Sequence, residues 1–348
     1  MATLTKTVIF SKRALYLVGA AIGGILIFFI LTRVIGFVKN AFIPPLQTPA
    51  TVAFGKIPQI DLSEGIKPLS RVHYTVETIS GDIGTFDANV KVFKMDEPVS
   101  AFGNLADTLE RAQSAGFGVQ PKELSSGIAT FVDPTDNTRF LTINTISQSV
   151  TLESKYLNKV EIFAARLKSQ QDAKNTAVNF FENLQLPIKD FPDEKIVLEN
   201  YRIENGIMDR AISLAATNLV KVIFARADID SLPIINPNSS NPLVFALATD
   251  KKVVTANYIV GNIQKYKFST YPLKDAKTAL DELQKGKGTL NKLPASNVFP
   301  IRSVLLGYLE TKKYQPYLQP VYIFLSDDGL TAYVGAVNDL WTFRDEAN

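Results

Sequence analysis

An apolar run near the N-terminus limits how this chain can be arranged. Residues 14–31 (ALYLVGAAIGGILIFFIL) are 18 consecutive residues without a charge. A helix of this length covers about 27 Å, close to the roughly 30 Å hydrocarbon core of a bilayer. The run exceeds the roughly 7 to 15 apolar residues of a cleaved signal peptide, and no clear small-x-small cleavage site follows it. We therefore expect a signal-anchor, a transmembrane helix over residues 14–38, with a cleaved signal peptide as the alternative.

The charges beside this run predict its orientation. Lys6, Lys12 and Arg13 precede it and outweigh the two basic residues that follow, so the positive-inside rule places the tail, residues 1–13, in the cytoplasm. The expected localisation is the cell membrane, single-pass, with the rest of the chain extracytoplasmic in the cell envelope. Residues 1–40 hold five basic residues and no acid, so the remainder of this chain of net charge +3 is nearly neutral. A neutral surface favours a protein partner over a polyanion.

Two glycines in the run have the spacing of a helix contact. Gly19 and Gly23 form a small-xxx-small pattern that lets a second transmembrane helix approach closely. The partner would be another membrane protein or, as a homodimer through the anchor, a second copy of this chain. Glycine is common in membrane helices, however, and the same spacing arises by chance.

The composition excludes most catalytic machinery. Zero Cys and one His remove thiol nucleophiles and thiolate zinc sites, and they make a histidine-based metal site or a Ser-His-Asp triad hard to build. The segment from Gly286 to Thr289 lacks the order of a phosphate-binding loop, and no serine-hydrolase motif occurs. His73 lies on the polar phase of a predicted strand, where a solvent-facing histidine is expected. We expect no cofactor, no metal, no catalytic residue and no nucleic-acid partner.

A proline-rich segment follows the anchor. Residues 39–68 contain five prolines, which lack backbone donors and prefer extended backbone, so we expect a stalk. Apolar residues are interleaved with the prolines more densely than a free linker needs. Whether part of the stalk lies along the folded body is therefore open.

The remaining sequence alternates between helix and strand signals. Amphipathic helices are predicted to start near Ser100, Ser169 and Ala276, and each is followed by runs rich in Val, Ile, Tyr and Phe with the period of strands. One helix covering one antiparallel sheet is a repeated α+β layer arrangement. The predicted fold class is α+β: an N-terminal transmembrane helix followed by two domains of antiparallel sheet packed with amphipathic helices, residues 69–167 and 168–345; the family resemblance described below implies that these domains are PepSY-like.

Pairs of acidic residues are the remaining catalytic candidates. A glycan hydrolase needs two carboxylates about 5 to 9 Å apart, and these can come from distant parts of a chain. At turns, Asp usually hydrogen-bonds to the backbone, so turn or surface roles are favoured for the local pairs. Those pairs are Asp133 with Asp136, Asp228 with Asp230, which would share a strand face, and Asp327 with Asp328.

One basic and aromatic segment is a candidate surface contact. Lys265, Tyr266, Lys267 and Phe268 alternate charge with aromatic rings, a pattern suited to anionic headgroups or wall polymers. The same alternation fits an ordinary strand with Tyr266 and Phe268 buried and the lysines solvated, which is the favoured interpretation.

The C-terminal half resembles a known group of proteins. A helix ending in Gly leads to a strand with a Leu-Gly-Tyr element and then to a Pro-Val-aromatic strand. The residues concerned are Ala279-Leu280, Leu283-Gln284-Lys285-Gly286, Ile301, Val304, Leu306-Gly307-Tyr308 and Leu318-Gln319-Pro320-Val321-Tyr322. Over residues 165–340 the chain thus resembles the YycH/YycI group of PepSY-like, membrane-anchored extracytoplasmic proteins. The resemblance implies a non-enzymatic regulator of a membrane sensor kinase that controls the cell wall; it carries over no site residue.

The expected function is that of a membrane-anchored extracytoplasmic binding or regulatory protein, without catalysis, that modulates another membrane or envelope protein. One alternative is a structural or ligand-binding envelope protein that contacts wall polymer or lipid through Lys265 to Phe268. The other is a carboxylate-dependent glycan hydrolase.

Overall fold

Strands dominate the part of the chain that the structure describes. The computed structural model describes residues 49–68, 71–99, 104–164, 167–238, 241–327 and 329–344. The chain divides into two units, Met1–Pro49 and Ala50–Asn348, and all the described helices and strands belong to the second unit. The predicted cytoplasmic tail, the predicted anchor and both Gly19 and Gly23 lie outside the described residues.

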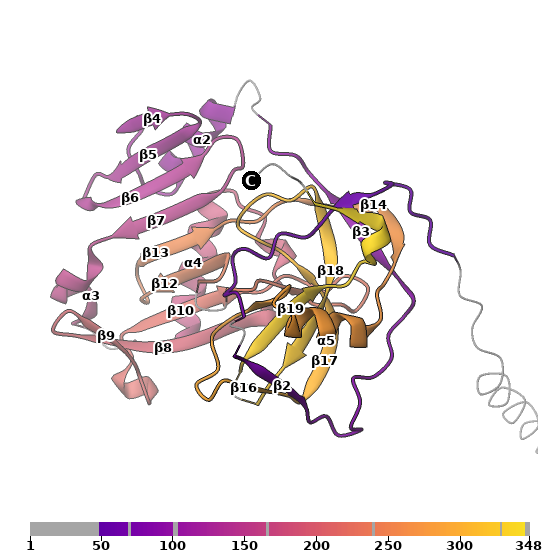
Figure 1. The fold of residues 1–348 in the computed structure, drawn as a ribbon. Helices are drawn as coiled ribbons and strands as arrows, with labels where there is room; N and C mark the ends of the chain where they lie inside the picture. The colour runs from indigo at the N-terminus through magenta and orange to yellow at the C-terminus, as the bar shows by residue number, and fades with distance from the viewer. Residues whose placement is uncertain are drawn as a thin grey trace, which may run out of the picture. The chain divides into compact units, whose positions relative to one another are not determined.

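The larger sheet has nine strands, all antiparallel to their neighbours (Figure 1). In sheet order they are β4 (Glu123–Ser125), β5 (Ile128–Asp133), β6 (Asp136–Asn144), β7 (Val150–Ser154), β13 (Val253–Tyr258), β12 (Val244–Ala248), β10 (Leu219–Phe224), β8 (Ile196–Glu204) and β9 (Ile207–Arg210). Along β5, buried and more exposed residues alternate, which is the burial period of a strand with one face in the core.

The second sheet has seven strands and lies to the right in Figure 1. Its main path is β11 (Ile234–Ile235), β17 (Ser303–Leu309), β18 (Tyr317–Leu325), β19 (Thr331–Gly335) and β15 (Thr289–Leu290), and β3 (Asn89–Met95) pairs with both β18 and β14 (Ile263–Pro272). Two short parallel pairs complete the strands: β1 (Ile57–Pro58) with β20 (Thr342–Phe343), and β2 (His73–Val76) with β16 (Val298–Ile301).

Helices are few and short. The described α-helices are α2 (Asn104–Ser114), α3 (Val160–Phe163), α4 (Gln170–Asn183) and α5 (Ala276–Gln284), with 3₁₀ turns η1 (Tyr156–Asn158), η2 (Ile188–Asp190), η3 (Asp193–Lys195), η4 (Leu214–Ala216) and η5 (Asp339–Trp341). Helix α4 starts where the sequence predicts: the Ser169 hydroxyl accepts a hydrogen bond from the Asp172 amide at 3.1 Å, which satisfies one free helix donor.

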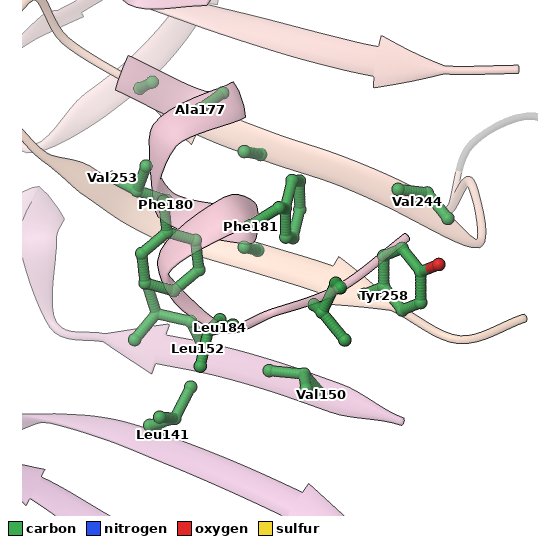
Figure 2. Packing of buried hydrophobic residues seen from close by; sticks show 14 of the residues in the cluster. Leu141, Val150, Leu152, Ala177, Phe180, Phe181, Leu184, Val244, Val253 and Tyr258 are labelled. Atoms are coloured by element: carbon green, nitrogen blue, oxygen red, sulfur yellow. The ribbon is translucent and has the colours of Figure 1, made fainter. Parts of the chain in front are cut away.

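The core of the nine-stranded sheet lies under α4. Phe180, Phe181 and Leu184 point from the helix onto the sheet, where they meet Leu152 and Tyr258 (Figure 2). The Phe181 and Tyr258 rings lie 5.8 Å apart. Contacts between these large apolar side chains hold the helix on the sheet.

The predicted α+β fold class is wrong. Strand residues far outnumber helix residues in the described part of the chain, and the strands do not form two helix-covered sheets in sequence order. Instead β7, from before the predicted boundary at Lys168, pairs with β13, from well after it. The physical reason is that β7 leaves one edge of backbone donors and acceptors free, and a strand from any part of the chain can satisfy them.

The structure does not bear out the predicted transmembrane helix and signal-anchor. No helix in the described part of the chain is both long and apolar enough to cross a membrane. The apolar run over residues 14–31, which carried the prediction, lies outside the described residues.

The C-terminal part of the predicted stalk lies along the folded body. Ile57 is fully buried and pairs in parallel with Thr342. Ile66 forms a bridge with Leu290. These contacts answer the question that the sequence leaves open, because residues 49–68 carry core side chains as well as prolines.

Candidate binding cleft

A large cleft in the described part of the chain lies where the two sheets meet. Its volume is about 780 Å³, within the range of about 300 to 1,000 Å³ that ligand sites occupy. It is lined by the segment after β3, by α2, by the β6–β7 turn, by the segment after α4, and by the β13–β14 and β17–β18 connections. Each sheet therefore contributes walls, and side chains far apart in the sequence come together.

A buried ion pair forms part of the cleft. Arg226 follows β10 in the nine-stranded sheet and Glu310 follows β17 in the seven-stranded sheet, and Arg226 Nε lies 3.1 Å from Glu310 Oε2. The Gly261 amide, between β13 and β14, donates to Glu310 Oε1 at 3.3 Å, and Arg226 also donates to the Gly261 carbonyl. Three segments are thus joined where the sheets meet.

Burial governs the acid–base properties of this pair. It raises the pKa of Glu310 from 4.5 to about 7, although Arg226 and the Gly261 amide favour the ionised form, and Asp190 raises it further. Burial also raises the pKa of Tyr258, on which the charges of Arg226 and Asp190 act as well. Glu310 is therefore a carboxyl group that changes charge near neutral pH.

Helix α2 supplies a second arginine. Arg111 donates from Nη1 to Gln148 Oε1 at 2.6 Å, while its Nε is buried without a hydrogen-bond partner among the described residues. Asp107 is exposed one turn earlier on the same helix, and Lys312 is exposed in the β17–β18 connection. A buried donor without a partner costs about 1 to 3 kcal/mol.

The cleft suits recognition of a group that carries both donors and acceptors. Its lining includes the basic residues Arg111, Arg226, Lys312 and Lys313 and the acidic residues Asp96, Glu97, Asp107, Asp190 and Glu310. Charges of both signs at short spacing match a polypeptide segment better than a uniform polyanion. No group of three or more His, Cys, Asp or Glu side chains that could hold a metal ion occurs among the described residues.

The predicted surface contact lies away from this cleft, on β14. Tyr266 is 98 % exposed and Phe268 is 43 % exposed, with Lys265 and Lys267 also exposed. The favoured interpretation, in which both rings are buried, is therefore wrong. The register explains why: Gln264 pairs with Lys94 but Phe268 pairs with the adjacent residue, Phe93, so residues 265–267 leave the ladder.

The local acidic pairs of the described residues are engaged in ion pairs. Each member described has a basic partner: Asp133 with Arg139 and Lys252, Asp136 with Lys159, Asp228 with Lys195, Asp230 with Lys91, and Asp327 with Arg302. Asp228 and Asp230 do not share a strand face, because β10 ends at Phe224. Asp328 lies outside the described residues, and His73 is exposed on β2 as expected.

The sequence interpretation missed the residues that form the cleft. Arg226 and Glu310 each follow a run of apolar strand residues, and that isolated charge at the end of a strand is the one signal they leave. It is weak, because a charge at a strand end is usually solvated. No protein family, curated protein or solved structure compared with the chain matches it. The resemblance to the YycH/YycI group therefore stays a prediction from the sequence motifs.

Proposed function

We propose that this chain is a non-catalytic binding protein of the cell envelope, located at the cell membrane with residues 50–344 outside the cytoplasm. It regulates a membrane or envelope protein by holding a polypeptide segment of that partner in the cleft. The observation that carries the proposal is the cleft of about 780 Å³ with charges of both signs and an unsatisfied Arg111 Nε. Its location rests on the sequence of residues 1–40 and its regulatory role on the family resemblance.

Site-specific crosslinking in cells tests the cleft. A photoreactive amino acid at Asp107 should capture one defined partner, because Asp107 is exposed beside Arg111 in the cleft. The matched control is Asp209, an exposed aspartate on the edge strand β9, which should capture none. Arg111→Glu should abolish the crosslink and Arg111→Gln should weaken it.

Two results would count against this function. One is the same crosslinked species from both aspartate positions, which would indicate random neighbours. The other is a crosslink at Asp107 that persists in full with Arg111→Glu. Proteolysis of intact cells tests the location, since residues 50–344 should be cleaved from outside.

Hydrolysis of envelope glycans is the second candidate, and one observation favours it. Glu310 has a pKa near 7, as a general acid requires, and Asp190 lines the same cleft. Binding ranks first because both Glu310 oxygens already interact with the protein, Oε1 with Gly261 and Oε2 with Arg226. Release of reducing sugars from cell wall by the full chain, lost with Glu310→Gln, would reverse this ranking.

A further inference from the structure

The strand pair formed by β14 and β3 (Figure 1) has a three-residue bulge in β14. The ladder runs from Ile263 to Gln264, stops, and resumes at Phe268, so residues 265–267 have no partner strand. We call these three residues the β14 bulge. Its central side chain, Tyr266, is 98 % exposed. One exposed ring is ordinary on a protein surface, so its significance depends on what surrounds it.

The bulge stands on a packed base. The Phe268 ring lies 5.8 Å from Phe93, whose ring also meets Tyr308 at 5.5 Å. Lys91 Nζ sits 4.4 Å from the centre of the Phe268 ring and also pairs with Asp230 at 3.0 Å. Exposure of Tyr266 is therefore not the result of a poorly packed strand.

The charged residues next to Tyr266 in the sequence and across the ladder are lysines. Lys265 and Lys267 flank it, and Lys94 is exposed on the neighbouring strand at the position where the ladder breaks. Among the residues that the structure describes, none of these three lysines forms an ion pair. The nearest acid along β3, Asp96, already accepts hydrogen bonds from the Asn262 and Gln264 side-chain amides. The bulge thus presents free positive charge around an aromatic tip.

The chain joins the folded unit beside this bulge. The Val52 amide donates to the Thr270 carbonyl at 3.0 Å, and the Ala53 amide donates to the Ser269 hydroxyl at 2.7 Å. Ser269 immediately follows Phe268, so residues 1–48 connect to the body within a few residues of the bulge. Those residues include the uncharged apolar run, which is the part of the sequence with affinity for a bilayer. The described part of the chain therefore begins beside the bulge, and the apolar run precedes it in the sequence.

We propose that the β14 bulge docks on an anionic membrane surface, with Tyr266 at the level of the headgroups and Lys265 and Lys267 on lipid phosphates. Tyrosine is favoured at this depth because its ring is apolar and its hydroxyl stays wet. Each lysine near an anionic leaflet contributes about 1 kcal/mol, an attraction that falls off within a Debye length. The inference rests on the proposed function only for the location of the chain at a membrane.

The absence of cysteine from the chain allows a direct test. The full chain carrying Tyr266→Cys is labelled with an environment-sensitive fluorophore and placed in nanodiscs of phosphatidylcholine, with or without phosphatidylglycerol. We expect a blue shift of the emission in the anionic discs, lost with Lys265→Glu plus Lys267→Glu and reduced in high salt. The control label is at Ile212, which is fully exposed just after β9, and it should show no shift.

Three outcomes would overturn the inference. They are an equal shift at Ile212, a shift that survives reversal of both lysines, and a shift produced by a soluble polyanionic wall polymer but not by anionic lipid. None of these affects the crosslink at Asp107, because the bulge residues do not line the cleft. Failure of lipid docking is therefore distinguishable from failure of the proposed function.

Discussion

In two buried arginine–carboxylate pairs of this protein, the pKa of the acid is shifted in opposite directions. In Arg139 with Asp133 and in Arg226 with Glu310, all four residues are only 5 to 7 % exposed, but Glu310 lies deeper in the fold than Asp133. Each guanidinium also lies near an aromatic ring and donates to a backbone carbonyl. The pKa of Asp133 is lowered, whereas that of Glu310 is raised to about 7.

The depth of burial and the number of donors together explain the difference. Burial alone would raise the pKa of Asp133, but hydrogen bonds from the amide and hydroxyl of Thr135, from Arg139 and from Lys252 outweigh it. Glu310 has only Arg226 at 3.1 Å and one amide at 3.3 Å, which do not offset its burial. An arginine partner by itself therefore does not fix the charge of a buried acid.

The two pairs also differ in what they join. Asp133 ends β5 and Arg139 lies in β6, so the first pair closes one hairpin of one sheet. The second pair links a segment after β10 to a segment after β17, in the cleft between two sheets. The weakly satisfied acid is thus at the junction, where its charge affects the contact between sheets.

Removal of the arginine at the junction is expected to have the largest effect. Arg226→Ala leaves Glu310 buried without its cation and should lower the free energy of unfolding by about 3 to 5 kcal/mol at pH 8. At pH 5 the loss should be smaller, because Glu310 is then protonated. Arg139→Ala should cost the same at both pH values, since Asp133 stays ionised. Urea denaturation at pH 5 and pH 8 measures this, and an Arg226→Ala loss independent of pH would contradict it.

Local structure was predictable from the sequence, but strand pairing was not. The capping serine of α4 and the alternation along β5 and β6 identify their elements, because caps and burial periods depend on nearby residues. The pairing of β7 with β13 is made by backbone hydrogen bonds, which form between two strands whatever their side chains are. The predicted fold class is wrong for this reason: it rests on three helix signals, whereas the pairing of the strands between them decides the architecture.

The cleft could not have been found from the sequence. Arg226 and Glu310 meet only because two sheets meet there, and neither has a neighbour in sequence that marks it. The bulge could be recognised as a basic and aromatic segment, but its exposure depends on the break in the β14–β3 ladder. Composition identifies candidate residues, and register decides which of them face solvent.

The pH dependence of the native protein should show both pairs. Glu310 has a folded pKa of about 7 against 4.5 when unfolded, so its stabilising contribution is complete below pH 4.5 and is lost as pH rises to 7. The loss is at most about 3 kcal/mol, at about 1.4 kcal/mol per unit. Asp133 behaves oppositely: its contribution is present above its ordinary value of 3.8 and is lost as pH falls through its lowered pKa.

Urea denaturation of native protein and Glu310→Gln from pH 4 to pH 8 separates these contributions. The native protein should become less stable between pH 5 and pH 7, and the Glu310→Gln variant should not. Among the described groups whose pKa is shifted, Glu310 is the one raised into this range. Parallel curves for the two proteins would show that Glu310 is already ionised at pH 5.

Removal of one donor from the better satisfied acid should have a moderate effect. Thr135→Val deletes the hydroxyl that donates to Asp133 Oδ1 at 2.7 Å and keeps the backbone amide in place. We expect a loss of about 1 kcal/mol at pH 7, because one hydrogen bond to a charged group is missing and the pKa of Asp133 rises toward its ordinary value. The loss should shrink as the pH falls toward the lowered pKa of Asp133, because protonation removes the charge that the hydroxyl stabilises. Thermal unfolding at pH 7 and pH 2 measures it, with Thr138→Val, which acts on Asp136, as the matched control.

The smallest effect is expected at Lys252. It tests how much each donor contributes to stabilising the ionised carboxylate of Asp133. Lys252 Nζ lies 3.2 Å from Asp133 Oδ2, but its side chain is one-third exposed, so solvent screens the interaction. Lys252→Met keeps the alkyl stem and should cost less than about 1 kcal/mol at pH 7 and low salt, with less still at 1 M salt. If the loss equals that of Arg226→Ala, the distinction between a well satisfied and a poorly satisfied acid is wrong, because Asp133 would then depend on one cation as Glu310 does. A small loss means that Thr135 and Arg139 suffice to keep Asp133 ionised, and that the junction acid differs from the hairpin acid by its missing donors.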